Sequence, residues 1–375
     1  MRILIAIGVR RQKEAGAAGV VLHHAAELSK RGHSVDCWFL EDVLERPVKP
    51  RFEALLFARQ VARRIRKEPR KYDVVNLHAP FGCVYGILRR WSKKRGLPPY
   101  VLTMHGSEER YVQAMRLEQK KGRASNFAWR NRLWHRIYHQ TMYDFSIKTA
   151  DFGAVVNRDA WICAELKYNR APGLFCYVPN GVEPRFLVPR AFAEKQALKL
   201  LFVGTWLDRK GTYYLADAFG LLASNDPQMS LTVAGSTAPE DQVRSVFPAP
   251  FRDRVKVLPF VSRDEVLAIY QAHDIFVFPS LMEGMPLTLL EAMATAMPVI
   301  TTNTCGMADV VEDEVNGLLV PPANSERLAC GIDRLGASRE LRERLGRAAQ
   351  ETMRRYTWER IAEKMEKIFV LAASR

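Results

Sequence analysis

Short continuous apolar runs recur along this chain, separated by segments whose apolar residues return every three or four positions. The runs are typical of strands buried on both faces, and the spacing between them is typical of amphipathic helices. Their alternation predicts parallel sheets with crossover helices. The expected strands are Ile3–Val9, Val35–Leu40, Asp73–His78, Tyr100–Met104, Gly153–Val156, Phe175–Val178, Lys199–Val203, Leu231–Ala234, Val255–Leu258, Asp274–Phe278, Pro298–Thr302 and Gly317–Val320.

The segment Pro179–Gln196 divides this pattern into two halves. It contains three prolines and little periodic apolar pattern, so it is expected to be a linker. A chain of 375 residues is also too long for one small core. We therefore expect an N-terminal domain over residues 1–185 and a C-terminal domain over residues 191–357.

The most informative motif follows the apolar run that ends at Pro279. Glu283 and Glu291 lie eight residues apart, around a turn that leads into Leu287–Ala296, a segment of good helix formers. The N–H groups of a first helical turn suit a phosphate, and an ionised carboxylate, which only accepts hydrogen bonds, suits hydroxyl groups. A diphosphate flanked by two polyols, as in a nucleotide sugar, fits this arrangement. An ordinary turn with two solvated glutamates is the alternative.

A second motif follows the expected strand Lys199–Val203. The loop Gly204–Gly211 carries Arg209 and Lys210 side by side, and a helix is expected to begin near Thr212. Open α/β sheets bind ligands at the carboxyl ends of their strands. The two cations can therefore stabilise negative charge on a departing nucleoside diphosphate, unless the loop is a solvated charged turn.

Together these motifs resemble the donor site of the retaining GT-B glycosyltransferases, in particular glycosyltransferase family 4. The resemblance implies an α/β fold of the GT-B type, in which two Rossmann-like parallel-sheet domains face each other across a cleft. It also implies that a last helix, within residues 358–375, packs back on the first domain. Many family members have an Arg where this chain has Thr205, and we assign that role to Arg209.

The resemblance gives each residue of the donor site a role. Glu283 contacts hydroxyls of the transferred sugar, Glu291 contacts the ribose, and Arg209 and Lys210 assist the departing diphosphate. The remaining donor-binding positions are Gly204, Gly284, Met285, Pro286 and Leu287.

The N-terminal half contains the expected acceptor side. His105 lies in Thr-Met-His-Gly after an expected strand, and this motif is similar to one whose histidine reaches the donor sugar in the family. A neutral imidazole can hydrogen-bond a sugar hydroxyl. Gly16 and Gly19 lie between the first strand and the first helix and resemble the glycine-rich acceptor loop of the family. Structural roles are expected for His23, His24 and His78.

Charge is unevenly distributed along the chain. Residues 1–190 carry 35 Lys and Arg against 17 Asp and Glu, whereas residues 191–375 carry 21 against 24. The basic half favours an anionic partner. Basic stretches with aromatic or apolar members, at 59–71, 89–95 and 110–143, suit an anionic membrane surface, and solvated helix faces are the alternative. Nucleic acid is not favoured, because no known binding module is present.

Missing patterns exclude several classes of protein. No apolar run is long enough for a transmembrane helix, and the N-terminus has the pattern of a first strand rather than a signal peptide. The six cysteines are scattered without a Cys-x-x-Cys pair. We therefore expect a cytoplasmic protein, either free or peripheral on the inner face of the membrane. Because Asp-x-Asp, His-Glu-x-x-His and Walker motifs are absent, no metal or other cofactor is expected.

The sequence thus predicts a metal-independent hexosyltransferase, and the resemblance alone implies retention of configuration. Its donor is a nucleotide-diphosphate sugar, and its acceptor is a glycan, a lipid or a lipid-linked molecule in cell-surface polysaccharide or glycolipid synthesis. Two alternatives stay open. One is a GT-B sugar phosphorylase or sucrose-phosphate-synthase-like enzyme, and the other is a non-catalytic GT-B protein that binds membrane or polyanion.

Overall fold

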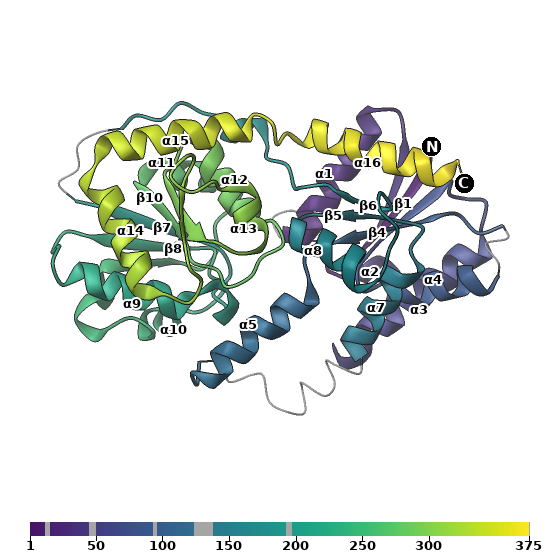
Figure 1. The fold of residues 1–375 in the computed structure, drawn as a ribbon, viewed down its shortest axis with the longest axis horizontal. Helices are drawn as coiled ribbons and strands as arrows, with labels where there is room; N and C mark the ends of the chain where they lie inside the picture. The colour runs from purple at the N-terminus through teal and green to yellow at the C-terminus, as the bar shows by residue number, and fades with distance from the viewer. Residues whose placement is uncertain (12–15, 45–49, 93–95, 124–137, 193–196, 375) are drawn as a thin grey trace. The chain divides into compact units, whose positions relative to one another are not determined.

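The computed structural model of the chain contains two α/β units (Figure 1). It describes residues 1–11, 16–44, 50–92, 96–123, 138–192 and 197–374. The first unit comprises Met1–Glu108, Asn126–Asn180 and Trp358–Arg375, and the second comprises Glu109–Ser125 and Gly181–Thr357. The segment 109–125, which the sequence prediction placed in the N-terminal domain, therefore belongs to the second unit.

The sheet of the first unit has six parallel strands in the order β2-β1-β3-β4-β5-β6. Their bounds are β1 Arg2–Ala6, β2 Ser34–Trp38, β3 Val74–His78, β4 Tyr100–Met104, β5 Phe152–Val155 and β6 Phe175–Tyr177. Every residue of β3 and β4 is buried, as the continuous apolar runs predict for central parallel strands.

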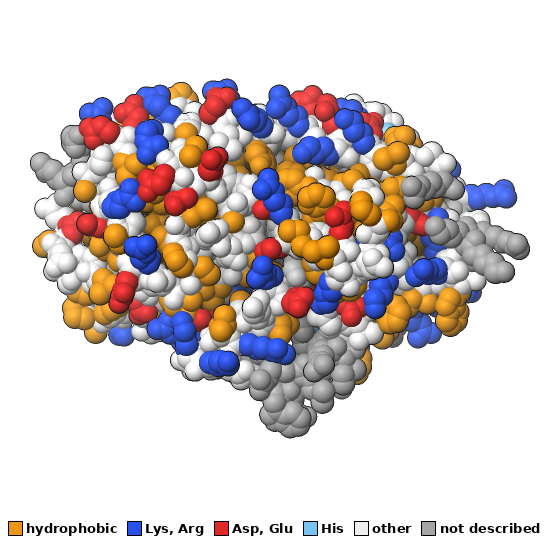
Figure 2. Space-filling model, in the orientation of Figure 1, with side chains coloured by type: hydrophobic (Ala, Val, Ile, Leu, Met, Phe, Trp, Pro, Cys, Tyr) orange, Lys and Arg blue, Asp and Glu red, His pale blue; other side chains and the backbone are white. Residues whose placement is uncertain are grey.

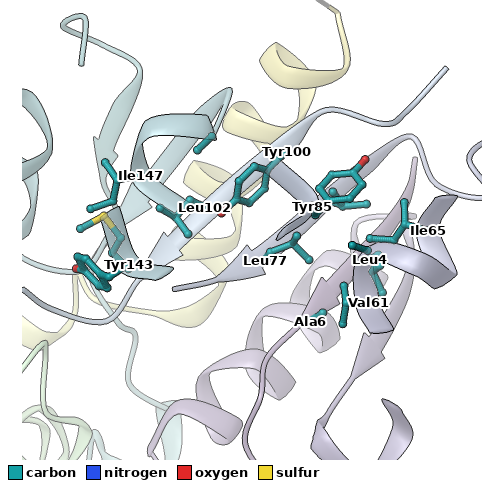
Figure 3. Packing of buried hydrophobic residues seen from close by; sticks show 14 of the residues in the cluster. Leu4, Ala6, Val61, Ile65, Leu77, Tyr85, Tyr100, Leu102, Tyr143 and Ile147 are labelled. Atoms are coloured by element: carbon teal, nitrogen blue, oxygen red, sulfur yellow. The ribbon is translucent and has the colours of Figure 1, made fainter. Parts of the chain in front are cut away.

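Helices cover both faces of this sheet (Figure 1). One face packs against α1 and α16, and the other against α3, α4 and α7. In Figure 3, Val61 and Ile65 of α3 point toward Leu4 and Ala6 of β1. The helices of this unit are α1 Gly16–Lys30, α2 Leu40–Val43, α3 Pro50–Lys67, α4 Cys83–Trp91, α7 Gln140–Thr149, α8 Arg158–Ile162, a π-helical turn Cys163–Lys167, and α16 Trp358–Ala373.

The sheet of the second unit also has six parallel strands, in the order β12-β11-β10-β7-β8-β9. Their bounds are β7 Lys199–Val203, β8 Ser230–Ala234, β9 Val255–Leu258, β10 Ile275–Phe278, β11 Val299–Thr302 and β12 Leu318–Val320. The helices of this unit are α5 Glu108–Lys120, α9 Thr212–Ala223, α10 Glu240–Ser245, α11 Glu265–Ala272, α12 Leu287–Ala294, α13 Cys305–Val310, α14 Ser325–Ala337 and α15 Arg339–Met353, with 3₁₀ turns at Pro184–Phe186, Asp208–Lys210 and Ala249–Arg254.

All twelve expected strands are present, with ends that shift by at most three residues. One prediction was wrong in detail. Gly16 and Gly19 do not lie in a loop, because α1 already begins at Gly16. Among the described residues, no helix is both long enough and apolar enough to cross a membrane.

Candidate active site

The predicted donor-site residues lie where the strand order of the second sheet reverses. Strands β7 and β10 are neighbours, but the chain continues from β7 toward β8 and β9 and from β10 toward β11 and β12. Such a reversal leaves room between the loops that follow the two strands, and ligands of open α/β sheets bind there. Arg209 and Lys210 follow β7, and Glu283 follows β10.

Backbone contacts hold these two loops together. The carbonyl of Arg209 accepts hydrogen bonds from the Leu281 N–H at 2.8 Å and from Oγ of Ser280 at 3.0 Å. Gly211 has a φ of +71°, and a Cβ there would lie 1.9 Å from the Pro279 carbonyl oxygen. The loop after β7 can therefore approach the loop after β10 this closely only with glycine at this position.

Glu283 brings both cations of the site together. Its Oε1 accepts from Lys210 Nζ at 2.8 Å and from Arg209 Nη1. Lys210 is only 9% exposed and lies over the ring of Phe278, 4.8 Å from its centroid. Burial lowers the pKa of Lys210, and the Glu283 carboxylate partly opposes this shift. Two cations and one carboxylate leave the cluster with net positive charge, which suits an anionic ligand.

The turn after Glu283 is packed against α13. The Gly306 N–H donates to the Glu283 carbonyl at 3.3 Å, and a Cβ on Gly306 would lie 1.7 Å from the Gly284 carbonyl oxygen. The side chain of Met285 is buried, so this residue can offer a ligand only its backbone. Helix α12 begins directly afterward at Leu287, and the amides of its first turn carry partial positive charge.

Glu291 lies on α12 beside a buried tyrosine. The Tyr270 hydroxyl lies 3.0 Å from Glu291 Oε2 and 3.1 Å from the Thr288 carbonyl oxygen. Burial raises the pKa of Glu291 to about 7, and this shift outweighs the effect of the Tyr270 hydrogen bond. The carboxyl group is therefore close to half ionised at neutral pH without a ligand.

Sequence reasoning gave no site role to three charged residues that act on Glu291. Glu183 accepts a hydrogen bond from Arg263 Nε at 3.1 Å, and its carboxylate lies 3.5 Å from Arg185 Nε. Glu183 raises the pKa of Glu291, whereas Arg185 and Arg263 lower it, so all three act on this carboxyl group. Arg263 is 80 residues from Glu183 in sequence, so no local pattern could have joined them.

The first unit contains the predicted acceptor-side residues. His105 follows the carboxyl end of β4 and is half-buried, and burial lowers its pKa to about 4. Its imidazole is therefore neutral at pH 7. The backbone at the next residue, Gly106, has a φ of +140°, and its carbonyl accepts a hydrogen bond from the Tyr143 hydroxyl. Gly16 is exposed at the start of α1, whereas Gly19 is buried inside the helix.

Nothing in the described part of the chain gathers three or more His, Cys, Asp or Glu side chains into a group that could hold a metal ion. Metal independence is not tested by this observation and stays a prediction.

Comparison with known proteins shows both the fold of this chain and the family to which it belongs. A sucrose-phosphate synthase from Thermosynechococcus elongatus superposes with a TM-score of 0.80 over 100% of both chains, at 20% identity. At this identity the likeness shows the fold alone, which is GT-B. The family model described as Glycosyltransferase Family 4 matches residues 15–186, and the model described as Glycosyl transferases group 1 matches residues 188–352. The chain belongs to glycosyltransferase family 4.

Two curated relatives illustrate the range of this family. An uncharacterized glycosyltransferase of Methanocaldococcus jannaschii is 30% identical over 175 residues, which are 46% of this chain and 45% of the relative. The Escherichia coli UDP-Gal:alpha-D-GlcNAc-diphosphoundecaprenol alpha-1,3-galactosyltransferase is 26% identical over 262 residues, or 67% of this chain and 62% of the relative. In both cases the chain spans less than two thirds of the relative's length.

Proposed function

We propose that this protein transfers a sugar from a nucleotide-diphosphate sugar to a hydroxyl acceptor, with the donor bound by the second unit. The observation that carries this proposal is the cluster of Arg209, Lys210 and Glu283 at the strand-order reversal, next to the start of α12. Cations and first-turn amides suit the diphosphate, and Glu283 and Glu291 supply acceptors for hydroxyl groups on either side of it.

In the proposed reaction, the bond between the anomeric carbon and the diphosphate oxygen breaks while the acceptor oxygen bonds to that carbon. Arg209, Lys210 and the amides at the start of α12 stabilise the negative charge that develops on the leaving diphosphate. The proton of the acceptor hydroxyl passes to a leaving phosphate oxygen, so no separate base is needed. This front-face route retains the anomeric configuration, as the resemblance to family 4 implies.

A transfer assay with labelled UDP- and GDP-sugars tests the donor site. We expect Glu283→Ala and Lys210→Ala to lower kcat by about 10²- to 10³-fold, the usual loss when a group that stabilises transition-state charge is removed. Glu312→Gln and Lys256→Ala are matched controls, because both side chains are exposed in the same unit. Unchanged turnover in both site variants would disprove the assignment.

Two further features of the reaction need their own measurements. The assay in excess EDTA should proceed at the rate measured without EDTA, because Arg209 and Lys210 supply the positive charge at the diphosphate. The anomeric proton coupling of the product, followed by NMR from the first turnovers, should match the configuration of the donor. Loss of activity in EDTA would disprove metal independence, and an inverted product would disprove retention.

We also propose that the acceptor is lipid-linked and that the first unit meets an anionic membrane surface. The Escherichia coli relative is named for a diphosphoundecaprenol acceptor. Helix α3 is amphipathic: Val61 and Ile65 lie in the core, while Arg59, Arg63 and Arg66 are exposed. Phe52 near its start is 46% exposed, and Trp91 at the end of α4 is 84% exposed. A basic face with exposed aromatic side chains suits anionic lipid headgroups.

The structure describes only part of the basic sequence. Lys93, Lys94 and Arg95, together with Phe127, Trp129 and Trp134, lie outside the described residues. On the face drawn in Figure 2, Lys and Arg side chains are interspersed with Asp and Glu. The described residues of this face form no single large basic patch, and the membrane proposal therefore depends on the basic residues of α3.

Sedimentation with vesicles tests this membrane contact. We expect binding to vesicles that contain anionic phosphatidylglycerol, no binding to pure phosphatidylcholine, and loss of binding at high salt. Exchanging Arg59, Arg63 and Arg66 for Gln should weaken binding by on the order of 10²-fold, because three cations at roughly 1 kcal/mol each sum to about 3 kcal/mol. Arg334→Gln on α14, Arg347→Gln on α15 and Arg354→Gln directly after α15 together give a control of equal charge change. Equal vesicle binding by both triple variants would contradict the role of α3.

A further inference from the structure

Two histidines of the first unit, His78 and His105, are in contact, although only His105 was expected to have a functional role. His78 ends β3 and is fully buried, and His24 of α1 is 4% exposed. In the parallel register of β3 and β4, His78 lies beside Thr103, which places it next to the residues that follow β4. The electrostatic influence of His105 reaches both His24 and His78. The sequence predicted only a structural role for His78.

A hydrogen bond joins His78 to His105. His78 Nδ1 lies 2.6 Å from His105 Nε2, and the two ring centroids are 4.8 Å apart. A neutral pair of imidazoles shares one proton in such a bond, so either His78 or His105 is the donor. The choice decides which nitrogen of His105 carries the remaining proton.

The surroundings of His78 determine the direction of this bond. Its other nitrogen, Nε2, is buried and has no hydrogen-bond partner. A buried N–H without an acceptor is rarer in folded proteins than a buried acceptor without a donor. A proton on Nε2 is therefore disfavoured, and neutral His78 carries its proton on Nδ1. His78 then donates and His105 Nε2 accepts.

We propose that His78 is a positioning residue that holds His105 in the Nδ1–H tautomer, so that His105 offers a ligand a hydrogen-bond donor rather than an acceptor. Among the described side chains and backbone groups, none bonds to Nδ1 of His105. Burial lowers the pKa of both rings, which keeps the pair neutral at pH 7. That the ligand is an oxygen atom of the nucleotide sugar rests on the proposed function, whereas the tautomer itself does not.

The tautomer can be measured directly in the intact protein without any substrate. Long-range ¹H–¹⁵N correlation of ¹⁵N-histidine-labelled protein at pH 7.5 distinguishes protonated from bare ring nitrogens in each of the eight histidines. The His105 signals are assigned by their loss in His105→Gln. We expect a protonated Nδ1 and a bare Nε2 for His105. A protonated Nε2, or rapid averaging of the two forms, would overturn the proposal.

Substitutions at His78 separate this role from simple packing. His78→Asn can keep an N–H donor at the position of Nδ1, His78→Leu removes it, and His78→Asp replaces it with an acceptor. We expect the Nδ1–H tautomer to persist in the Asn variant, to be lost in the Leu variant and to invert in the Asp variant. His23→Phe is the control, since its ring stacks on Trp358 with centroids 4.6 Å apart.

The same variants give a kinetic signature if the protein transfers sugar. We expect His78→Leu and His78→Asp to lower kcat by about tenfold or more, the effect of one lost hydrogen bond, with a smaller change in donor KM. His78→Asn should recover most of kcat. The proposal would be overturned if kcat of the His78 variants fell only in proportion to their melting temperature while the His105 tautomer stayed unchanged. Absence of transfer by the unmodified protein would contradict the proposed function, but the NMR result would still decide the tautomer.

Discussion

Lys210 and Arg209 hold Glu283 in different ways. The Lys210 side chain is 11% exposed and is enclosed by Phe278 and Glu283, whereas the Arg209 side chain is 28% exposed. A buried ammonium has few alternative positions, but a partly exposed guanidinium can rotate toward an added anion. In the proposed function, both cations act on the diphosphate, Lys210 from a fixed position that also holds Glu283 for a sugar hydroxyl, and Arg209 by rotating toward a phosphate.

Glu291 gives a pH prediction at the residue scale. Its pKa in the folded protein, about 7, is above the ordinary value of 4.5. Between these values the folded state binds more protons than the unfolded state, so Glu291 makes stability fall as pH rises from about 4.5 to about 7. Replacing Glu291 with Gln should remove this decline and stabilise the protein at pH 8, relative to pH 5, by on the order of 2 kcal/mol.

Urea unfolding of the wild type and Glu291→Gln at the two pH values measures this difference. Glu312→Gln, which removes an exposed carboxyl group of the same unit, is the control. An identical effect of Glu291→Gln at pH 5 and pH 8 would show that Glu291 titrates normally.

The sequence predicts the contacts of some site residues but not those of others. Glu283, Arg209 and Lys210 stand in local motifs, and the structure brings them together as expected. His78 and His105 are 27 residues apart, and their contact depends on the pairing of β3 with β4. The Glu183–Arg263 pair likewise joins distant segments. Such contacts are properties of the folded sheet edges, so no spacing rule could have predicted them.

At the scale of elements, Gly211 controls how the loop after β7 meets the loop after β10. Gly211→Ala introduces a Cβ that would lie 1.9 Å from the Pro279 carbonyl oxygen, in addition to a left-handed backbone. We expect a loss of roughly 2–4 kcal/mol in unfolding free energy, because a backbone strain of 1–2 kcal/mol combines with a backbone clash.

Gly173→Ala is the matched control for this prediction. Gly173 has a φ of +80° with nothing within 4 Å of the added Cβ, so only the backbone strain applies. Urea unfolding of both variants compares the two contributions. Equal losses of unfolding free energy in the two variants would mean that the loops after β7 and β10 can move apart at no cost, and would contradict the prediction.

Helix α5 is attached to the second unit by a buried tyrosine–carboxylate contact. The Tyr214 hydroxyl of α9 donates to Glu118 Oε1, and Lys121 Nζ lies 2.9 Å from the same hydroxyl. Glu118 is fully buried, and its other oxygen has no partner. Tyr214→Phe keeps the ring but leaves this carboxylate without its donor, which should destabilise the docking of α5 by about 1–3 kcal/mol.

Hydrogen–deuterium exchange across Glu108–Lys120 measures this effect, and we expect faster exchange there in Tyr214→Phe. Tyr213→Phe, at the neighbouring position, removes a hydroxyl without touching Glu118 and serves as control. Unchanged exchange in Tyr214→Phe would show that other contacts hold α5.

The sequence predicts the bounds of some helices and strands more accurately than those of others. Strands β4, β7 and β9 have the bounds that their apolar runs predict. The start of α1 was placed too late, because Gly16-Ala17-Ala18-Gly19 was assigned to a loop on its resemblance to the glycine-rich acceptor loop of the family. Tertiary packing overrides the weak helix preference of glycine, and Ala18 and Gly19 are buried in the helix.

For the whole molecule, the repeated β–α pattern was enough to predict two parallel-sheet units. It could not predict that residues 109–125 belong to the second unit, because the partner of this segment, Tyr214, lies about 100 positions away in the chain. The resemblance to family 4, which the two family models confirm, rests on motifs from both units. No comparable sequence motif in the first unit identifies the acceptor molecule.

The central claim is that the second unit binds a nucleoside diphosphate through Lys210 and Glu291, and calorimetric titration with UDP and GDP in EDTA tests it most directly. We expect one of the two to bind with one site per chain. Lys210→Ala and Glu291→Gln should each raise its Kd by about tenfold or more, the effect of a lost charged hydrogen bond, whereas Lys256→Ala leaves Kd unchanged. No binding of either nucleotide, or equal Kd values in all four proteins, would contradict the account.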